Sequence, residues 1–318
     1  MREIVTTDNT ITVTEAGAAV WEAYAAELDA SEKTKATYTR ALRQFAAWLE
    51  DAGLTPLQAK RETVLAYRAD LAAAKSASTV NLYLAAVRSF YRWLESRRVY
   101  PNVAAGVRGL KTSAKQGKDA LTRDQAAELV KPRGDDLASL RDAAMLTLMC
   151  RRGLRTIEIS RANIGDVRQV GGKAVLYVQG KGYADKGEFV VLEASCLKPL
   201  YAYLEARGEK DPAAPLFASL SHRNAGGRMT TRSISRVAKQ SMKEIGIAGA
   251  RLTAHSLRHT AVTAALAGGA TVQEAQAMAR HSNINTTMIY AHNLTRTEAR
   301  AERAADAWFD GFEAPRAA

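Results

Sequence analysis

The sequence predicts a multi-domain fold: an all-α N-terminal bundle, then a mixed α+β, mainly helical domain with a small antiparallel sheet. Three observations predict this class. Apolar residues recur at helical spacing up to about residue 100, a segment rich in glycine and basic residues interrupts the pattern, and two β-branched runs then follow among further helices. With 318 residues, the chain is long enough to form two separate hydrophobic cores.

The N-terminal part contains two clear amphipathic helices. The first has apolar residues at i, i+4, i+7 and i+11, namely Tyr38, Leu42, Phe45 and Leu49. We expect Ser31 to cap this helix and Gly53 to end it. The second follows Ser78 and carries Val80, Leu84, Val87, Tyr91 and Leu94. With shorter helices expected near 12–28 and 62–74, these predict a small bundle over residues 1–107, whose aromatic side chains form its core.

The composition changes after this bundle. Residues 101–122 combine a proline, three glycines and four basic residues with no helical stripe, which is typical of an extended linker. We place the linker at 108–120 and a second domain at 121–295, followed by a C-terminal tail at 296–318. The linker is interpreted either as a solvated tether or as a basic strap along phosphates, and the sequence does not decide between them.

The second domain is expected to begin with a helix capped by Ser139 and ended by Gly153, with another starting at "TIEIS". Residues 173–192, "KAVLYVQGKGYADKGEFVVL", predict a hairpin with Lys181 at its crest. Helices return from residue 230. Gly268 and Gly269 interrupt them, and Thr271 is the expected cap of the next helix.

Charge and hydropathy limit the classes of partner and compartment. The net charge is +12, and residues 108–318 hold +11 of it, so a polyanionic partner would meet mainly the second part. No apolar run approaches the roughly 18 residues that a membrane span needs, and no secretory signal is expected at the N-terminus. Cys150 and Cys196 are too few for a disulfide framework. We therefore expect a cytoplasmic protein with two buried thiols and no membrane contact.

Three segments of the second domain carry groups suited to chemistry on phosphate. They are "RRGLRTIEIS", "AHSLRHTAV" and "RHSNINTTMIY". Together with the hairpin lysine they supply two guanidiniums, two imidazoles, an ammonium, a carboxylate and a phenol: Arg155, Arg258, His255, His281, Lys181, Glu158 and Tyr290.

These groups fit one reaction. Only about one phenol in a thousand is ionised at pH 7, so a tyrosine nucleophile needs assistance. Two arginines can neutralise charge that builds on a phosphodiester, an imidazole can move a proton near neutrality, and a lysine can protonate a departing alkoxide. The product is a covalent phosphotyrosine. Because such a transfer depends mainly on positioning and electrostatics, we expect neither a metal nor another cofactor.

The ordered set Arg-x-x-Glu, hairpin Lys, His-x-x-Arg, His and Tyr resembles the tyrosine recombinases, the phage-integrase and Xer type of site-specific DNA recombinase. The resemblance runs over about residues 12–312. It implies a SAM-like core-binding bundle followed by the family's catalytic domain. It also implies an enzyme that cleaves and rejoins double-stranded DNA, with four protomers exchanging strands through a Holliday junction.

The resemblance also assigns roles to residues. It implies that Tyr290 attacks the scissile phosphate and holds its 3' end, while Arg155 and Arg258 clamp the phosphoryl oxygens. Lys181 would protonate the leaving 5' hydroxyl, and His255 would assist proton transfer at the tyrosine. Finally, His281 would hydrogen-bond the transition state, and Glu158 would orient its neighbours.

Three residues depart from the family pattern. Arg280 stands where glycine is usual before the histidine, Ala261 follows "HSLRHT" where an aromatic residue is common, and Arg152 replaces a small polar residue. None removes a reacting group. We expect these departures to affect the backbone near His281 and the packing of the "HSLRHT" helix.

Several alternatives stay open on the sequence alone. Glu158 could be structural, and Lys186 competes with Lys181 on the same hairpin. His255 and His259 have the i, i+4 spacing of zinc ligands, but Arg258 lies between them and no third ligand is near, so we expect no metal site. A catalytically silent DNA-binding protein and a topoisomerase-like or resolvase-type strand transferase are the alternative functions.

The tail predicts an amphipathic helix with apolar residues Ala301, Ala305, Trp308, Phe309 and Phe312 and an acidic opposite face. It could pack on its own domain. The resemblance instead implies docking on a neighbouring protomer in a DNA-bound homotetramer, and this is the expectation adopted here. The sequence does not distinguish the integrase of a mobile element from an Xer-like resolvase, nor does it give the DNA target.

Overall fold

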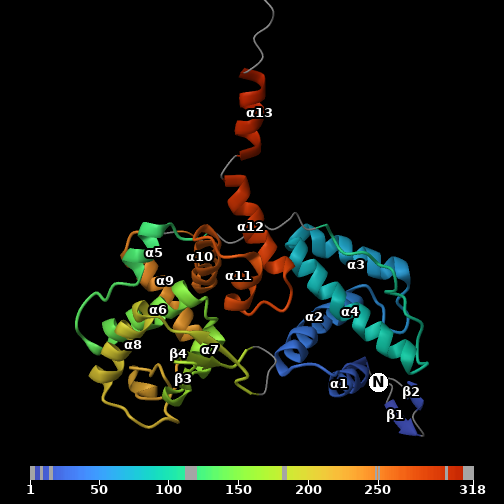
Figure 1. Cartoon of the computed structure of the whole chain (residues 1–318). Helices are drawn as coiled ribbons and strands as arrows, with labels where there is room; N and C mark the ends of the chain where they lie inside the picture. The colour runs from blue at the N-terminus through green and yellow to red at the C-terminus, as the bar shows by residue number, and fades with distance from the viewer. Residues whose placement is uncertain are drawn as a thin grey trace, which may run out of the picture. The chain divides into compact units, whose positions relative to one another are not determined.

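The computed structural model describes residues 4–7, 10–13, 17–111, 120–180, 185–247, 249, 251–297 and 300–310. The chain divides into two compact units, Met1–Gln116 and Gly117–Ala318, each with its own core. Figure 1 shows the elements of both units in chain order. No helix among the described residues is both long and apolar enough to cross a membrane.

The first unit is a helical bundle preceded by a hairpin. The hairpin pairs β1 (Ile4–Thr7) with β2 (Thr10–Val13) in antiparallel register. The helices are α1 (Gly17–Glu27), α2 (Glu32–Asp51), α3 (Arg61–Ala74) and α4 (Ala77–Ser96). The expected start of the first helix at residue 12 is wrong, since "TITV" is rich in β-branched residues, which favour strands.

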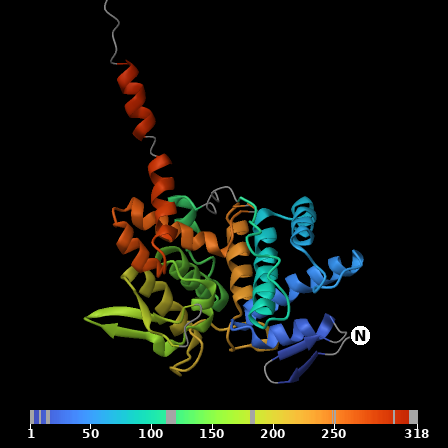
Figure 2. The same ribbon diagram turned by 90° about the vertical axis from the view of Figure 1, so that its right-hand side faces the viewer.

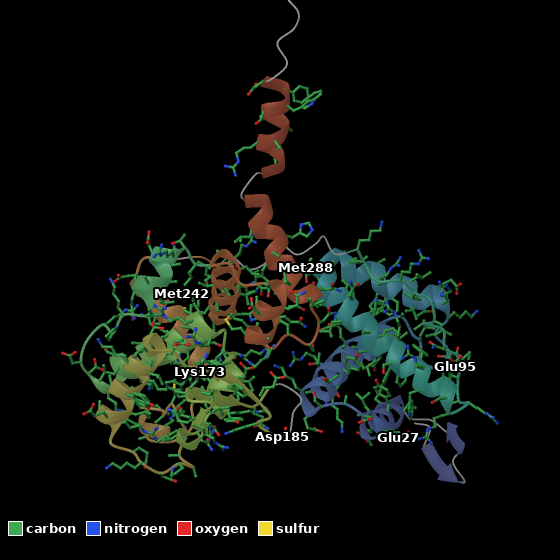
Figure 3. All side chains as sticks on the ribbon, viewed as in Figure 1. Glu27, Glu95, Lys173, Asp185, Met242 and Met288 are labelled. Atoms are coloured by element: carbon green, nitrogen blue, oxygen red, sulfur yellow. The ribbon has the colours of Figure 1, made fainter. Side chains whose placement is uncertain are left out.

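The other helix boundaries of this unit lie close to those expected, although α4 is capped by Ser76 and not by Ser78. Ser31 caps α2 by accepting a hydrogen bond from the Thr34 amide, and Gly53 follows the helix in the left-handed conformation, with φ +67°. The predicted stripes are buried, and the aromatic side chains lie in the core, where Phe45 packs on Tyr67 with ring centroids 4.7 Å apart. Glu27, labelled in Figure 3, accepts a hydrogen bond from the Trp93 ring and so ties α1 to α4.

Residues that follow α4 pack against the bundle. Ala104 and Val107 are buried in its core. The Asn81 side chain both donates to the Leu110 carbonyl (3.0 Å) and accepts from the Leu110 amide (2.7 Å), while Arg68 donates to the Arg108 carbonyl. The start of the expected linker is therefore fixed on the first unit. Residues 112–119 lie outside the described part of the chain.

The second unit is mainly helical with one three-stranded sheet. Its helices are α5 (Arg123–Leu129), α6 (Leu137–Arg152), α7 (Thr156–Arg161), α8 (Ala194–Arg207), α9 (Thr231–Glu244), α10 (Ala254–Ala267), α11 (Val272–Ala279), α12 (Asn285–Thr297) and α13 (Arg300–Asp310). Short 3-10 turns cover Ile164–Asp166 and His222–Asn224. The predicted fold class, a helical bundle followed by a mainly helical domain with a small antiparallel sheet, is confirmed.

The sheet has the antiparallel order β3 (Val167–Val170), β4 (Lys173–Val178), β5 (Glu188–Val191). The predicted hairpin is its β4–β5 pair, in which Leu176 faces Val190 and both side chains are buried in the core of the unit. On the exposed face Tyr177 pairs with Phe189, with ring centroids 5.6 Å apart. Figure 2 shows the sheet at one edge of the helical unit.

Two features of the second unit differ from the sequence-based expectations. Helix α6 begins earlier than expected because Asp136, not Ser139, is its N-cap and accepts hydrogen bonds from the amides of Ala138 and Ser139. Helix α8 does not emerge from the sequence pattern, because Pro199 interrupts that pattern from within. Gly153 ends α6 as predicted, with φ +62°, and Thr271 caps α11 through a capping box with Glu274.

Candidate active site

Arg155 lies at the N-terminus of α7, directly after the turn that ends α6. Its backbone amide donates to Glu158 Oε2 and its Nη1 donates to Glu158 Oε1, both at 2.7 Å. Glu158, the third residue of α7, thus accepts from the N-cap amide and is also an ion-pair partner. The Glu158 side chain is fully buried, whereas the Arg155 side chain keeps 31% of its surface exposed. This contact orients the Arg155 guanidinium.

A second arginine holds the same carboxylate. Arg280 ends α11, and its Nη2 donates to Glu158 Oε2 at 2.7 Å while its Nε lies 3.4 Å from Oε1. Burial alone would raise the pKa of Glu158, but the two arginines outweigh burial and lower it. Glu158 is therefore a charged, buried link between α7 and α11. In the sequence, Arg280 stands out only as a departure from a pattern.

Arg258 is a fully buried cation on α10. Its Nη1 donates to the Gly153 carbonyl at 2.6 Å and its Nη2 donates to the Ala279 carbonyl, so it connects the ends of α6 and α11. Burial, followed by the charges of Arg155 and Arg280, lowers the pKa of Arg258 to about 9. Arg258 still carries its proton at neutral pH. Arg155 donates to the carbonyl of Arg280 and Arg258 to that of Ala279, so the two guanidiniums bind neighbouring peptide groups.

His281 follows α11 and faces the same group of arginines. Its Nδ1 lies 2.8 Å from the hydroxyl of the buried Thr287. Burial lowers the pKa of His281 to about 4, and the nearby charges of Arg258, Arg155 and Arg280 act in the same direction. At neutral pH the ring is therefore uncharged, with one nitrogen held by Thr287.

Tyr290 lies on α12 and is 8% exposed. Its ring packs in a small apolar cluster with Val262, Ala275 and Ala279, from α10 and α11. The His281 ring lies nearly parallel to it, with centroids 6.3 Å apart. Burial raises the pKa of Tyr290, and the positive charge of Arg258 opposes that rise. The phenol is therefore protonated at neutral pH and lies within the electrostatic reach of one arginine.

Two histidines of α10 also approach the tyrosine. His255 is exposed at the start of the helix, and its ring contacts that of His259, one turn later, with centroids 4.7 Å apart. The His259 ring in turn lies 4.8 Å from that of Tyr290. Sequence reasoning considered His259 only as a zinc ligand. The sequence signal that could have indicated His259 as a site residue is its position, one helical turn after His255 and next to Arg258.

A cavity of about 900 Å³ opens beside Arg155 and His281. Arg155, Glu158, Arg280 and His281 line one part of it, and the ends of β4 and β5 line another. Lys181 lies outside the described residues. Its chain neighbour Gly180 lines the cavity, as does Asp185, which is labelled in Figure 3. Lys186, the competing lysine, forms an ion pair with the buried Asp166.

The structure thus brings together most of the residues that the sequence singled out. Arg155, Arg258, His281 and Tyr290 meet where the ends of α6 and α11 face α7, α10 and α12, with Glu158 beneath them. His255 lies at the rim of this group. Thr287 emerges only from the structure, which also adds Arg280 and His259 to the site although sequence reasoning assigned neither of them a role in it. Such a site combines cations, a neutral imidazole and a phenol.

Comparison with known proteins gives two family matches. The phage integrase family matches residues 119–296, and the phage integrase N-terminal SAM-like domain matches residues 21–98. Tyrosine recombinase XerC of Pelobacter propionicus is 32% identical over 270 residues, which cover 84% of this chain and 86% of the relative.

Solved structures share the fold at low sequence identity. The XerH site-specific recombinase bound to palindromic difH substrate superposes with a TM-score of 0.74 at 18% identity, over 92% of this chain and 85% of that chain. A lambda integrase tetramer bound to a Holliday junction gives a TM-score of 0.67 at 16% identity, over 86% and 76% of the respective chains.

Proposed function

Since the chain belongs to the phage integrase family and is a tyrosine recombinase, an enzyme that cleaves and rejoins DNA at specific sites, we propose that Tyr290 is its nucleophile. The observation that carries this proposal is the meeting of four side chains: Arg155 and His281 line the cavity, the Tyr290 ring lies beside that of His281, and Arg258 binds the carbonyl of Ala279 behind them. In this proposal Tyr290 Oη attacks the scissile phosphorus, the bond to the 5' oxygen breaks, and a 3'-phosphotyrosyl intermediate forms.

The two arginines provide the main electrostatic stabilisation in this mechanism. Arg155 presents a guanidinium to the cavity, and Arg258 supplies a second positive charge from the buried side. Both are fixed before DNA arrives, because Glu158 holds one and two backbone carbonyls hold the other. Preorganised charges of this kind stabilise the extra negative charge of a pentavalent phosphoryl group without reorganising.

Proton transfers complete the reaction. The Tyr290 proton must leave as the oxygen–phosphorus bond forms, and His255 would assist that transfer, with the His259 ring between the two. Neutral His281, its Nδ1 held by Thr287, would donate from Nε2 to a phosphoryl oxygen. Lys181 would protonate the departing 5' oxygen. Its neighbour Gly180 borders the cavity, and Lys186 is engaged with Asp166.

Helix α9 offers a surface for the DNA backbone. Arg232, Arg236, Lys239 and Lys243 recur at i, i+4, i+7 and i+11 and are all exposed, while Ile234, Ala238 and Met242 face the core. One side of the helix is thus a row of four cations spaced along about three turns. We assign this row, with the basic linker 108–120 and the bundle of residues 1–107, to DNA binding outside the reacting centre of the catalytic domain 121–295.

Assembly on DNA is proposed to be a homotetramer that exchanges strands through a Holliday junction. Along α13 the described side chains from Glu302 to Asp310 are exposed, and Trp308 and Phe309 are each 69% exposed. Such a large apolar exposure favours docking on another copy, as expected for the tail 296–318. Phe312 of the predicted stripe lies outside the described residues. On α12, Met288, labelled in Figure 3, is also exposed.

The nucleophile can be tested on DNA sites that the protein itself selects from a random library. A selected duplex is then nicked near its centre, so that a cleaved strand end is lost and the covalent complex accumulates. Tyr290→Phe should form no adduct in a denaturing gel and bind DNA within about twofold of wild type, since it lacks only a hydroxyl. Tyr203→Phe is the matched control, because its buried hydroxyl accepts a bond from the Ala218 amide elsewhere in the domain.

An unchanged adduct in Tyr290→Phe would show that another residue attacks. Binding without any adduct in the wild-type protein would favour the catalytically silent alternative. Relaxation of supercoiled DNA without strand exchange would favour the topoisomerase-like alternative. These three outcomes give different bands, so one set of gels distinguishes them.

A further inference from the structure

Arg280 occupies a backbone position that disfavours its own side chain. It ends α11 with φ 54° and ψ 50°, in the left-handed region, and the turn is closed by hydrogen bonds from the Arg280 amide to Ala277 and from the His281 amide to Gln276. Glycine forms this turn without steric conflict, whereas other L residues adopt it only at an energetic cost. The backbone alone therefore gives no reason for an arginine here.

The side chain supplies the reason. It is 5% exposed and lies against the fully buried Glu158 carboxylate, with Nη2 2.7 Å from Oε2. Its Nη1 donates to the Met278 carbonyl at 2.6 Å, which fixes the guanidinium in place. Its own carbonyl accepts a hydrogen bond from Arg155 Nη2 at 3.0 Å. Arg280 therefore contacts Arg155 through its backbone and shares Glu158 with it through its side chain.

Sharing the carboxylate changes the charge available at the site. With Arg280, one carboxylate is shared by two guanidiniums, from Arg155 and Arg280. Without Arg280, the buried negative charge of Glu158 would be compensated chiefly by Arg155. An arginine that is paired with a single buried carboxylate presents less positive potential to an incoming phosphate.

We propose that Arg280 is a positioning residue of the recombinase site. By accepting a hydrogen bond from Arg155 it keeps the Arg155 guanidinium directed at the scissile phosphate, and by sharing the charge of Glu158 it leaves more of the positive charge of Arg155 available to that phosphate. This inference rests on the proposed function. It also explains the role of Glu158, which orients Arg155 at the cost of a negative charge that Arg280 offsets.

The test combines charge removal with charge restoration. Arg280→Met keeps the length of the side chain but removes its charge, and single-turnover cleavage of the nicked duplex should fall about 10- to 100-fold, the usual range for a group that orients a reacting one. DNA affinity should stay within about twofold, since the buried Arg280 side chain is engaged with Glu158. In the double variant with Glu158→Gln the buried charge is gone, so the rate should recover at least about fivefold over Arg280→Met. Arg280→Lys should lose less than Arg280→Met.

A matched control separates the side chain from the turn. Arg98 is the other described non-glycine residue with a positive φ, 55°, and it is exposed in the first unit. Arg98→Gly relieves the same backbone conflict without removing an ion pair, so the shift of its thermal unfolding midpoint measures the backbone effect alone. Arg280→Gly relieves the conflict as well but should cleave slowly. If the arginine merely forms the turn, Arg280→Gly will match the wild type and the proposal fails.

Other outcomes are equally decisive. Strictly additive losses in Arg280→Met and Glu158→Gln would overturn the proposal, because the two residues would then act independently. If Arg280→Met does not fold, the comparison of Arg280→Lys with the double variant decides in its place. A wild-type protein that forms no adduct contradicts the proposed function instead. In that case the free energies of unfolding are compared for the wild type, Arg280→Met, Glu158→Gln and the double variant. If the two substitutions change the free energy of unfolding independently, the inference is overturned.

Discussion

The two units of the chain bury different kinds of side chain. In the first unit the buried positions are apolar or aromatic, as in the cluster around Phe45, Tyr67 and Phe90. Among the described residues, every buried polar or charged side chain other than tyrosine lies in the second unit, including Glu158 and Arg258. The first core thus serves stability alone, whereas the second also holds charge in place.

The difference follows from the free energy of burying each kind of side chain. Removing apolar surface from water stabilises a fold, whereas burying a charge costs free energy unless hydrogen bonds and opposite charges compensate. In the second unit the compensation is local: two carbonyls for Arg258, two arginines for Glu158. At the candidate site, burial of Glu158 and Arg258 is therefore compensated rather than a net source of stability, which is consistent with the catalytic role proposed for this site.

The largest effect should come from the apolar core. Phe45→Ala removes a fully buried ring from the first unit and should lower the free energy of unfolding by about 3–5 kcal/mol. Three of the four tryptophans, Trp21, Trp48 and Trp93, belong to this unit, so tryptophan fluorescence in urea reports its transition. Leu82→Ala, on the exposed side of α4, is the control and should change the midpoint little. Equal shifts in both variants would contradict the assignment of the core.

Removing a buried charge at the candidate site should change the reaction rate rather than mainly the stability. Arg258→Gln should lower the rate of covalent adduct formation about 100- to 1000-fold, the cost of one preorganised transition-state donor. Arg141, another buried arginine, pairs with Asp142 and donates to the Ala218 carbonyl away from the site. Arg141→Gln should therefore lower the thermal midpoint but leave the rate at saturating DNA near that of wild type. Similar rates in both variants would remove the distinction between structural and functional charges.

The sequence predicted groups that the structure brings together at the candidate site, but not the way they are supported. Arg155, Arg258, His281 and Tyr290 belong to short motifs whose order along the chain is diagnostic, so their meeting could be anticipated. Their partners could not. The bond between Thr287 and His281 and the ion pair of Arg280 with Glu158 depend on where α11 and α12 approach α7, which is a matter of tertiary packing.

Fold prediction shows the same division. Strong periodicity and capping residues located α2, α3 and α11 well, and α4 except that its N-cap is Ser76 rather than Ser78. The hairpin β1–β2, helix α8 with its internal Pro199 and the Asp136 cap were missed. In each case a local propensity or a side-chain hydrogen bond competed with the apolar pattern. The apolar pattern alone does not show which of these influences determines the local structure.

A surface charge should have a smaller and more uniform effect than a buried one. Neutralising Arg236 and Lys239 on α9 together should weaken DNA binding about tenfold at moderate salt, whatever the sequence bound. It should also reduce the slope of log affinity against log salt by about 0.9 for each phosphate that is no longer neutralised. Fluorescence anisotropy over a salt series measures both quantities. Lys198→Gln, on the exposed side of α8, is the control; an equal loss there would mean that net charge alone acts.

A pH dependence of stability should arise from His281. The folded protein lowers the pKa of this ring from 6.5 to about 4, chiefly by burial, so between these pH values the unfolded chain binds more protons than the folded one. The stabilisation is therefore complete above pH 6.5 and is lost as the pH falls toward 4, by at most about 1.4 kcal/mol per pH unit for one proton.

His281→Asn, which can still bond to Thr287, should flatten this dependence when thermal unfolding is followed by circular dichroism. The useful window is about pH 5 to 6.5, because the pKa of Glu158 is lowered and its contribution declines only below its ordinary value of 4.5. His222→Asn, at an exposed position, should leave the wild-type slope intact. A slope that persists in His281→Asn would place the titrating group elsewhere. The ring would then be free to carry charge at the pH of the reaction, and the hydrogen-bonding role proposed for it would have to give way to an electrostatic one.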